Sequence, residues 1–271
     1  MDEAGSVRCR QALPAPLGPV AVVLGLVAMY ACAGVAAPLV GLRPLLIVSE
    51  AALVVPGLIL LAGFGIPFRD GLALGRVDRR RVILSIAAGA SLWAASLGLL
   101  ELQYVVWQPP PGYLEAFRRL HEALRPADPF DALFSVAAIA LAPALCEELL
   151  FRGIVLPSFL RALGPAGAVA GSAALFGLIH LDFTQPGVPV LYRVPFAFAV
   201  GVGFGALRLL TGALPPVILA HATLNTITLL ATPLVDDPSQ PMPDPKPLVG
   251  VALLLAGSAL TGLSLRKSQR R

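Results

Sequence analysis

The stretch LAPALCEELLFRGIVLP (residues 141–157) decides the fold, because it places two adjacent carboxylates, Glu147 and Glu148, inside an otherwise apolar run. A charged side chain at the centre of a bilayer helix costs about 2.5–3.5 kcal/mol even on the more lenient insertion scales. Two such charges therefore need an interaction or a function that compensates for this cost. Ionisable groups at this depth are by default candidates for a functional site.

Two later apolar segments also carry isolated polar side chains. His180 lies in AALFGLIHL (173–181), and His221 and Asn225 lie in VILAHATLN (217–225). A single histidine in a membrane helix is often only a hydrogen-bond partner for a neighbouring helix. Two of the chain's three histidines fall in such segments, however, and they accompany the carboxylates. The polar residues of the three segments together predict one site within the membrane.

The composition of the chain is that of an integral membrane protein. Of its 271 residues, 57% are hydrophobic and 13% are charged, and the mean hydropathy is +0.81. Soluble domains carry about 25% charged residues, so a soluble globular protein is excluded. The pI near 9.3 does not indicate a nucleic-acid partner, because the basic residues gather at the ends of the apolar segments. The expected surroundings are the lipid bilayer.

Eight apolar segments have the length of a membrane-spanning helix, for which about 20 mostly apolar residues suffice. They run near 19–40, 45–66, 82–104, 131–151, 165–181, 192–210, 214–233 and 247–265. The sequence therefore predicts an all-α polytopic bundle of about eight transmembrane helices, which forms one integral membrane domain over residues 1–271. In the connection at 112–125, leucine and phenylalanine recur at helical spacing, which predicts a helix on the membrane surface.

The Lys and Arg residues predict the orientation of this bundle. With the N-terminus inside, fourteen of the twenty fall on the cytoplasmic side and six on the other. Cytoplasmic loops carry the excess of Lys and Arg in membrane proteins, so both termini are expected in the cytoplasm. The abundance of Ala, Leu, Arg and Pro suggests a bacterium, which makes the inner (cell) membrane the expected location.

Spacing within the first polar segment distinguishes its two glutamates. Glu148 and Arg152 are four residues apart, so they share one helix face in the order that favours an ion pair. Such a pair lowers the cost of carrying both charges into the membrane. Glu147 is rotated by about 100° and lacks this partner. A buried carboxylate without a cation beside it suits a general base or acid.

A turn between the first two polar segments aligns Glu147 with His180. If the helix of Glu147 continues to Leu163, the turn falls at Gly164-Pro165. Glu147 is then 17 residues before the turn glycine, and His180 is 16 residues after it. At a rise of about 1.5 Å per residue, the two side chains lie nearly level in an antiparallel hairpin. We therefore predict a long hairpin that brings them to the same depth.

Three short motifs, in order and each within an apolar segment, resemble those of the CPBP family. They are Glu147-Glu148-x-x-x-Arg152, Phe176-x-x-x-His180 and His221-x-x-x-Asn225. The family comprises the CAAX prenyl proteases of type II, or ABI proteins, and their bacterial relatives. Any one of these motifs is weak, whereas all three in order are a specific signal. The resemblance covers roughly residues 128–232, and eight spans agree with the family's architecture.

The resemblance implies an intramembrane glutamic endopeptidase that uses no metal ion and no other cofactor, with its catalytic core at 128–232. Glu147 and His180 would activate a water molecule for attack on the peptide carbonyl. His221 and Asn225 would form the oxyanion hole. The supporting residues would be Glu148 and Arg152, and Phe176 is expected to be a packing residue.

The implied partner is a membrane-associated protein or peptide that serves as substrate. Prenylated CAAX proteins are the eukaryotic substrates of the family. Bacterial relatives are associated with membrane-anchored proteins, with C-terminal sorting signals, or with peptide maturation and self-immunity. The motif residues do not choose among these substrates.

Two other functions fit the same polar residues. A zinc-dependent membrane hydrolase could use a glutamate together with His180 and His221 as a three-ligand open site, although the chain lacks HExxH. Alternatively, the polar residues could serve helix packing or ion passage in a membrane scaffold or transporter without catalysis. The sequence contains no broken-helix inverted repeat that would support a transporter.

Overall fold

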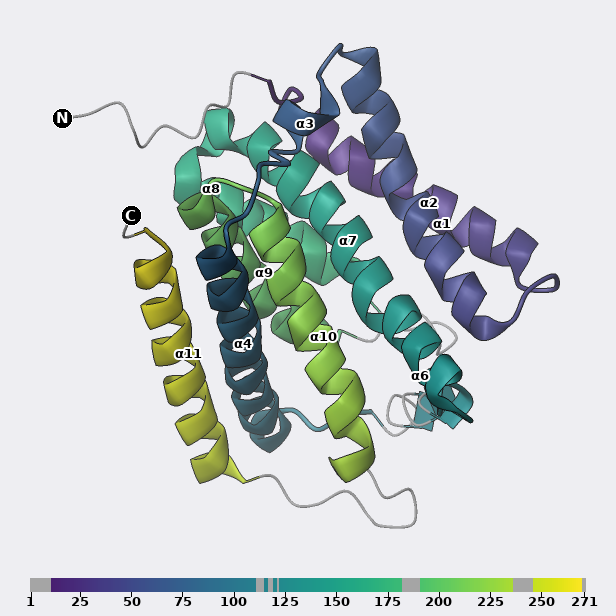
Figure 1. Ribbon diagram of the computed structural model, residues 1–271, viewed down its shortest axis with the longest axis vertical. Coiled ribbons are helices and arrows are strands. Elements are labelled where there is room, and N and C mark those ends of the chain that lie inside the picture. Colours follow the sequence, from purple (N-terminus) through teal and green to yellow (C-terminus); the bar gives the residue numbers. More distant parts are fainter. Residues whose placement is uncertain are drawn as a thin grey trace.

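The computed structural model is helical throughout the part of the chain that it describes (Figure 1). The described residues are 11–110, 115–116, 119–120, 122–181, 191–235 and 246–269. The prediction of an all-α fold is confirmed. Part of the surface helix predicted at 112–125 lies outside the described residues, as do both chain ends and the loop at 236–245.

The helices before the polar segment are α1 (Leu17–Ala36), α2 (Leu42–Gly63), α3 (Phe68–Gly71) and α4 (Arg79–Val106). The polar segment consists of α6 (Pro129–Val136), η2 (Ala137–Leu141), α7 (Ala142–Glu148), η3 (Leu149–Val155) and α8 (Leu156–Leu178), where η denotes a π-helix. The helices after it are α9 (Val194–Thr211), α10 (Pro215–Val235) and α11 (Pro247–Gln269).

Within the described residues, five helical stretches are long and apolar enough to cross a membrane. They are Leu17–Ala36, Leu42–Gly63, Arg79–Val106, Pro129–Leu178 and Val194–Thr211. Shorter apolar stretches at Pro215–Ala231 and Pro247–Leu263 belong to α10 and α11. The 50-residue stretch Pro129–Leu178 contains two of the spans that the sequence predicts. The chain is thus an integral membrane protein, and the count of eight crossings stays a prediction.

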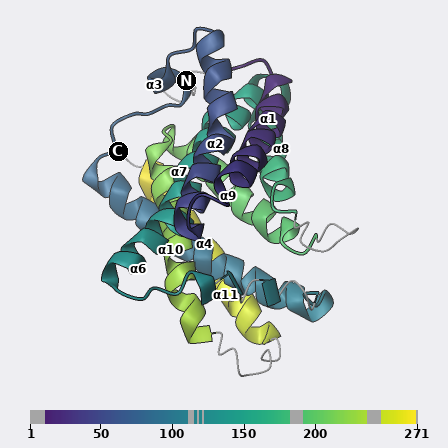
Figure 2. The same cartoon turned by 90° about the vertical axis from the view of Figure 1, so that its right-hand side faces the viewer.

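The helices are arranged around the polar segment. The α1–α2 hairpin packs on one side of it, and α4 pairs with α11 on the other side, next to α10 (Figures 1 and 2). Glycine permits the close approach of α11 to α4, because a Cβ on Gly257 of α11 would overlap the Ala95 backbone of α4. Val23 and Val27 on the outer face of α1 are 60% and 63% exposed. An apolar outer face of this kind is expected of a helix in contact with lipid.

Gly164 divides α8 into two arms. Its φ of 67° and ψ of 177° are a conformation that only glycine adopts without strain. The Ser172 hydroxyl of the second arm donates to the carbonyl of Phe151, at 3.1 Å, so the chain has folded back beside the helix that precedes the turn. This geometry confirms the predicted turn at Gly164-Pro165.

Two π-helical stretches, η2 and η3, flank the short helix α7 that carries the glutamates. Each ends two residues before a proline, Pro143 or Pro157. Proline has no N–H and its ring clashes with the carbonyl four residues earlier, so regular α-helical bonding is interrupted there. The backbone hydrogen bonds there join residues five apart instead of four, as in the bond from the N–H of Ala142 to the carbonyl of Ala137. Turns of this kind occur frequently at functional sites.

Candidate active site

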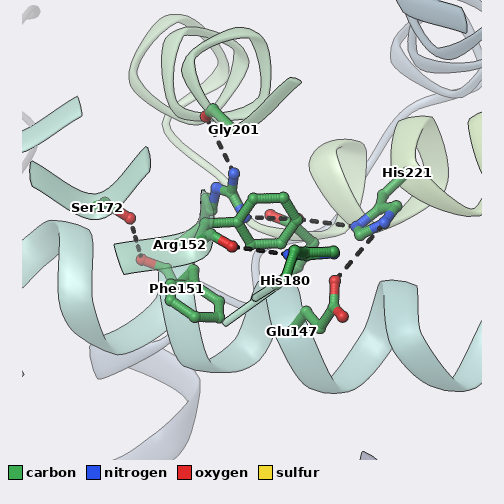
Figure 3. A network of polar contacts seen from close by, with 9 residues as sticks. Glu147, Phe151, Arg152, Ser172, His180, Gly201 and His221 are labelled. Atoms are coloured by element: carbon green, nitrogen blue, oxygen red, sulfur yellow. Dashed lines mark hydrogen bonds and ion pairs between the residues drawn. The ribbon is translucent and has the colours of Figure 1, made fainter. Parts of the chain in front are cut away.

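The predicted polar residues come together from several elements. Glu147 and Glu148 end α7, with Arg152 one turn later in η3. His180 follows the end of α8, and His221 belongs to α10. Figure 3 shows the side chains of Glu147, Arg152, His180 and His221 grouped together.

Glu148 and Arg152 form the predicted ion pair. Arg152 Nη1 donates to Glu148 Oε1 at 2.9 Å, and both side chains are fully buried. Arg152 Nη2 donates to the carbonyl of Gly201 in α9, at 3.0 Å (Figure 3). The guanidinium carbon lies 4.5 Å from the centre of the Phe176 ring and 5.4 Å from that of Phe204. Arg152 is therefore held by one carboxylate, one carbonyl and aromatic faces, which is favourable for a cation removed from water.

His221 extends this network toward Glu147. Its Nδ1 is 2.9 Å from Glu148 Oε1, and its ring stacks on Phe204 at 4.6 Å between centroids. Because Glu148 is paired with Arg152 and accepts as a carboxylate, Nδ1 of His221 is the donor. Nε2 then points to the other side of the ring, where it lies 3.8 Å from Glu147 Oε2. Glu148 thus orients the imidazole.

Glu147 has no comparable partner. It is buried, and within the described part of the chain its carboxylate makes no hydrogen bond. Its nearest ion-pair contact is the 3.8 Å approach of His221 Nε2, which exceeds hydrogen-bond distance. This carboxylate is therefore available to bind water or a substrate group, as the spacing of the two glutamates predicts.

His180 is held by the backbone of its own helix. Its Nδ1 is 2.8 Å from the carbonyl of Phe176, and since a carbonyl only accepts, Nδ1 must donate. Nε2 of a neutral imidazole then carries the lone pair. The rings of His180 and His221 lie 4.9 Å and 6.2 Å from the Phe176 ring, so both histidines surround one aromatic side chain (Figure 3). Phe176 packs between them, as expected.

Asn225 lies one turn after His221 in α10 and is half-buried. Its Nδ2 donates to the carbonyl of Ile139, at the long distance of 3.5 Å. Ile139 is four residues before Pro143, so proline deprives this carbonyl of its usual α-helical donor. The interrupted helix therefore supplies the acceptor that holds the Asn225 amide beside the polar segment.

The zinc alternative requires three ligand side chains grouped around one point. In the residues whose structure is described, no three His, Cys, Asp or Glu side chains are arranged to hold a metal ion. The two histidines are instead engaged through Nδ1 with Phe176 and Glu148.

Glu50 and Arg193 are charged residues near this site that were not predicted. Glu50 of α2 lies close enough to act electrostatically on the Glu147 carboxylate. Arg193, which precedes α9 and is exposed, acts on both Glu147 and His180. The rule that singled out Glu147 would also have found Glu50, because Glu50 is a carboxylate within the apolar segment 45–66.

Residues 129–227 match a family model described as Rce1-like, a type II CAAX prenyl endopeptidase. The match runs from α6 into α10 and contains all three motifs. No curated protein and no solved structure gives a match to the chain. The match confirms the family that the motifs resemble. The segment is similar to the Rce1-like domain of type II CAAX prenyl endopeptidases.

Proposed function

We propose that the protein is a glutamic-type intramembrane endopeptidase in which Glu147 and His180 activate water. The observation that carries this proposal is the way in which each is held. Glu147 has an unpaired buried carboxylate, and His180 is anchored through Nδ1, which leaves a lone pair on Nε2. Two proton acceptors, neither of them occupied by a hydrogen-bond donor, suit the removal of a proton from a single water molecule.

The reaction follows from these two acceptors. A water molecule bound to Glu147 and His180 loses a proton to them as its oxygen attacks the carbonyl carbon of the peptide bond. The carbonyl oxygen becomes the oxyanion of a tetrahedral intermediate. When the C–N bond breaks, the proton moves to the departing nitrogen. The products are a new C-terminal carboxylate and a new amine.

Oxyanion stabilisation is assigned to His221 and Asn225, with one condition. A His221 ring that donates through Nδ1 to Glu148 can donate through Nε2 only as an imidazolium. The Asn225 amide makes only a 3.5 Å bond to Ile139, so it can exchange this acceptor for the oxyanion at little cost.

Glu148 and Arg152 act as support in this scheme. Their ion pair fixes the acceptor that orients His221, and Arg152 ties α7 and η3 to α9 through Gly201. The proposed catalytic core extends over 128–232, with the remaining helices forming one membrane domain with it. We further propose a bacterial inner-membrane location with both termini in the cytoplasm, supported by the asymmetry of Lys and Arg residues.

Single-turnover cleavage of a lipid-anchored reporter peptide by the detergent-purified protein tests the proposal. Glu147→Gln keeps the shape of the side chain but removes the proton acceptor, so we expect cleavage to fall to background in a folded protein. The matched control is Glu115→Gln, which changes an exposed glutamate paired with Arg119 and should leave the rate unchanged. Normal cleavage by Glu147→Gln would refute the proposal.

The zinc hydrolase is separated from this scheme by chelation. We expect the purified enzyme to keep its rate after exhaustive treatment with a chelator, and elemental analysis to find no stoichiometric zinc. Loss of activity that added zinc restores would replace the glutamic mechanism by a zinc-dependent one.

A further inference from the structure

Glu50 is a half-buried carboxylate that the proposed mechanism does not use. It lies in the membrane-spanning helix α2, outside the segment 129–227 that matches the family model. It shares the inward stripe of that helix with Leu53, Val54 and Gly57, which are one and two turns further along. The stripe packs against α7 and η3.

The register of α2 places Glu50 beside the catalytic carboxylate. A Cβ on Gly57 would lie 2.7 Å from Ile154 and 3.4 Å from Leu150, so these residues face each other. The two helical segments run in the same direction (Figure 1). Two turns back from Gly57, Glu50 is therefore level with residues about two turns before Ile154, where Glu147 lies.

The charges at this place agree with the register. The Glu50 carboxyl lies close enough to act electrostatically on Glu147 and on its neighbour Cys146. This proximity is consistent with the register, which brings the Glu50 carboxyl to the Glu147 side of α7.

Glu50 has no cationic partner to offset a second negative charge. Within the described residues no cation pairs with it, and its Oε2, which is closed to solvent, receives no hydrogen bond from an N–H or O–H group. The buried cation of the site, Arg152, is committed to Glu148. Two carboxylates brought to the same side of a helix in an apolar interior are costly to ionise together, and one proton held between them removes that cost.

We propose that Glu50 is a positioning residue of the active site, which shares one proton with Glu147 and so orients the Glu147 carboxylate toward the reacting water. The effect on rate rests on the function proposed for Glu147, whereas the shared proton does not.

Infrared difference spectra of the carboxyl C=O stretch test the shared proton without any turnover. We expect a protonated-carboxyl band in the wild type that is absent in Glu50→Gln and shifted in frequency in Glu147→Gln, because the latter replaces a carboxylate acceptor by an amide. The same change at Glu101, whose carboxylate binds the backbone N–H of Lys246 at 2.9 Å, should leave the band in place. A wild-type spectrum without a band assignable to Glu50, or a band that Glu147→Gln does not shift, would overturn the proposal.

Kinetics then test the positioning role. Glu50→Leu removes the hydrogen bond to Glu147, so we expect kcat to fall about tenfold or more at unchanged KM. Glu50→Gln retains a donor of the same shape and should recover most of the lost kcat. Both variants should fold, because leucine is more favourable than glutamate in hydrocarbon and glutamine keeps the shape of the side chain. Thermal unfolding will verify this.

The outcomes of the kinetic test are distinct. A wild-type kcat in Glu50→Leu would show that Glu50 has no role in the rate, and a rise of KM alone in both variants would show a substrate contact instead. Either result overturns the positioning role. Normal turnover by Glu147→Gln in the same assay would refute the proposed function itself, while the infrared result on the shared proton would still stand.

Discussion

Glu148→Gln is the most informative perturbation of the buried network, because Glu148 holds two partners with one oxygen. Oε1 accepts from Arg152 Nη1 and from His221 Nδ1, both at 2.9 Å. Gln keeps the shape of the side chain and can still accept, but it removes the negative charge. Arg152 then keeps only neutral acceptors, the amide oxygen and the Gly201 carbonyl, together with the aromatic faces around it.

The magnitude follows from burial. Both members of the Glu148–Arg152 pair are fully buried, so solvent does not screen the loss. Removal of one partner of a buried ion pair costs about 3–5 kcal/mol, because it leaves an uncompensated charge in the interior. We expect Glu148→Gln to lower the free energy of unfolding by about 3 kcal/mol, the lower end of that range, since the amide oxygen still accepts a hydrogen bond.

Equilibrium unfolding in mixed detergent micelles measures this loss, with cleavage recorded in parallel. The double variant Glu148→Met/Arg152→Met replaces both charges by apolar side chains and should be about as stable as the wild type. It should nevertheless remain inactive, because His221 has lost its orienting acceptor. If Glu148→Gln lowers the free energy of unfolding by less than about 1 kcal/mol, which is the contribution of an exposed ion pair, the reasoning is refuted.

Three further predictions concern the oxyanion donor, the proline that supports it, and the topology. Asn225→Ala removes one neutral donor and leaves water activation intact, so single-turnover cleavage should fall by about 10²–10³ rather than to background. Pro143→Ala restores an N–H that can bond the Ile139 carbonyl, so thermal stability should rise while cleavage falls as Asn225 loses its acceptor. Reporter fusions after Arg81 and at the C-terminus should be cytoplasmic, and one within 236–246 should be outside; an external C-terminus would contradict eight spans.

Local spacing predicted the parts of the site that lie on one helix. The ion pair between Glu148 and Arg152 follows from their separation by four residues, and the structure contains it. The turn at Gly164 follows from a glycine and a proline between two apolar runs, and the structure turns there. Both features depend only on residues close in the chain, where helical periodicity determines which side chains meet.

Contacts between distant helices could not be predicted in this way. The bond between His221 and Glu148 joins residues 73 positions apart, and the bond from Arg152 to Gly201 depends on the path of α9. Which ring nitrogen donates therefore emerged only from the packed structure. The two histidines differ in the partner of Nδ1, which is a backbone carbonyl for His180 and a carboxylate for His221.

The two prolines around α7 explain why the site can use backbone groups inside a membrane. Hydrocarbon tolerates an unsatisfied carbonyl poorly, so a carbonyl freed by proline must find another donor. Asn225 of α10 supplies one for Ile139. The carbonyl of Phe151, which already accepts the N–H of Leu156, receives the Ser172 hydroxyl from the second arm of α8 as a further donor. These bonds tie α8 and α10 to the segment that carries the glutamates. The helix with the proposed base is thereby bonded to the residue that we propose as oxyanion donor.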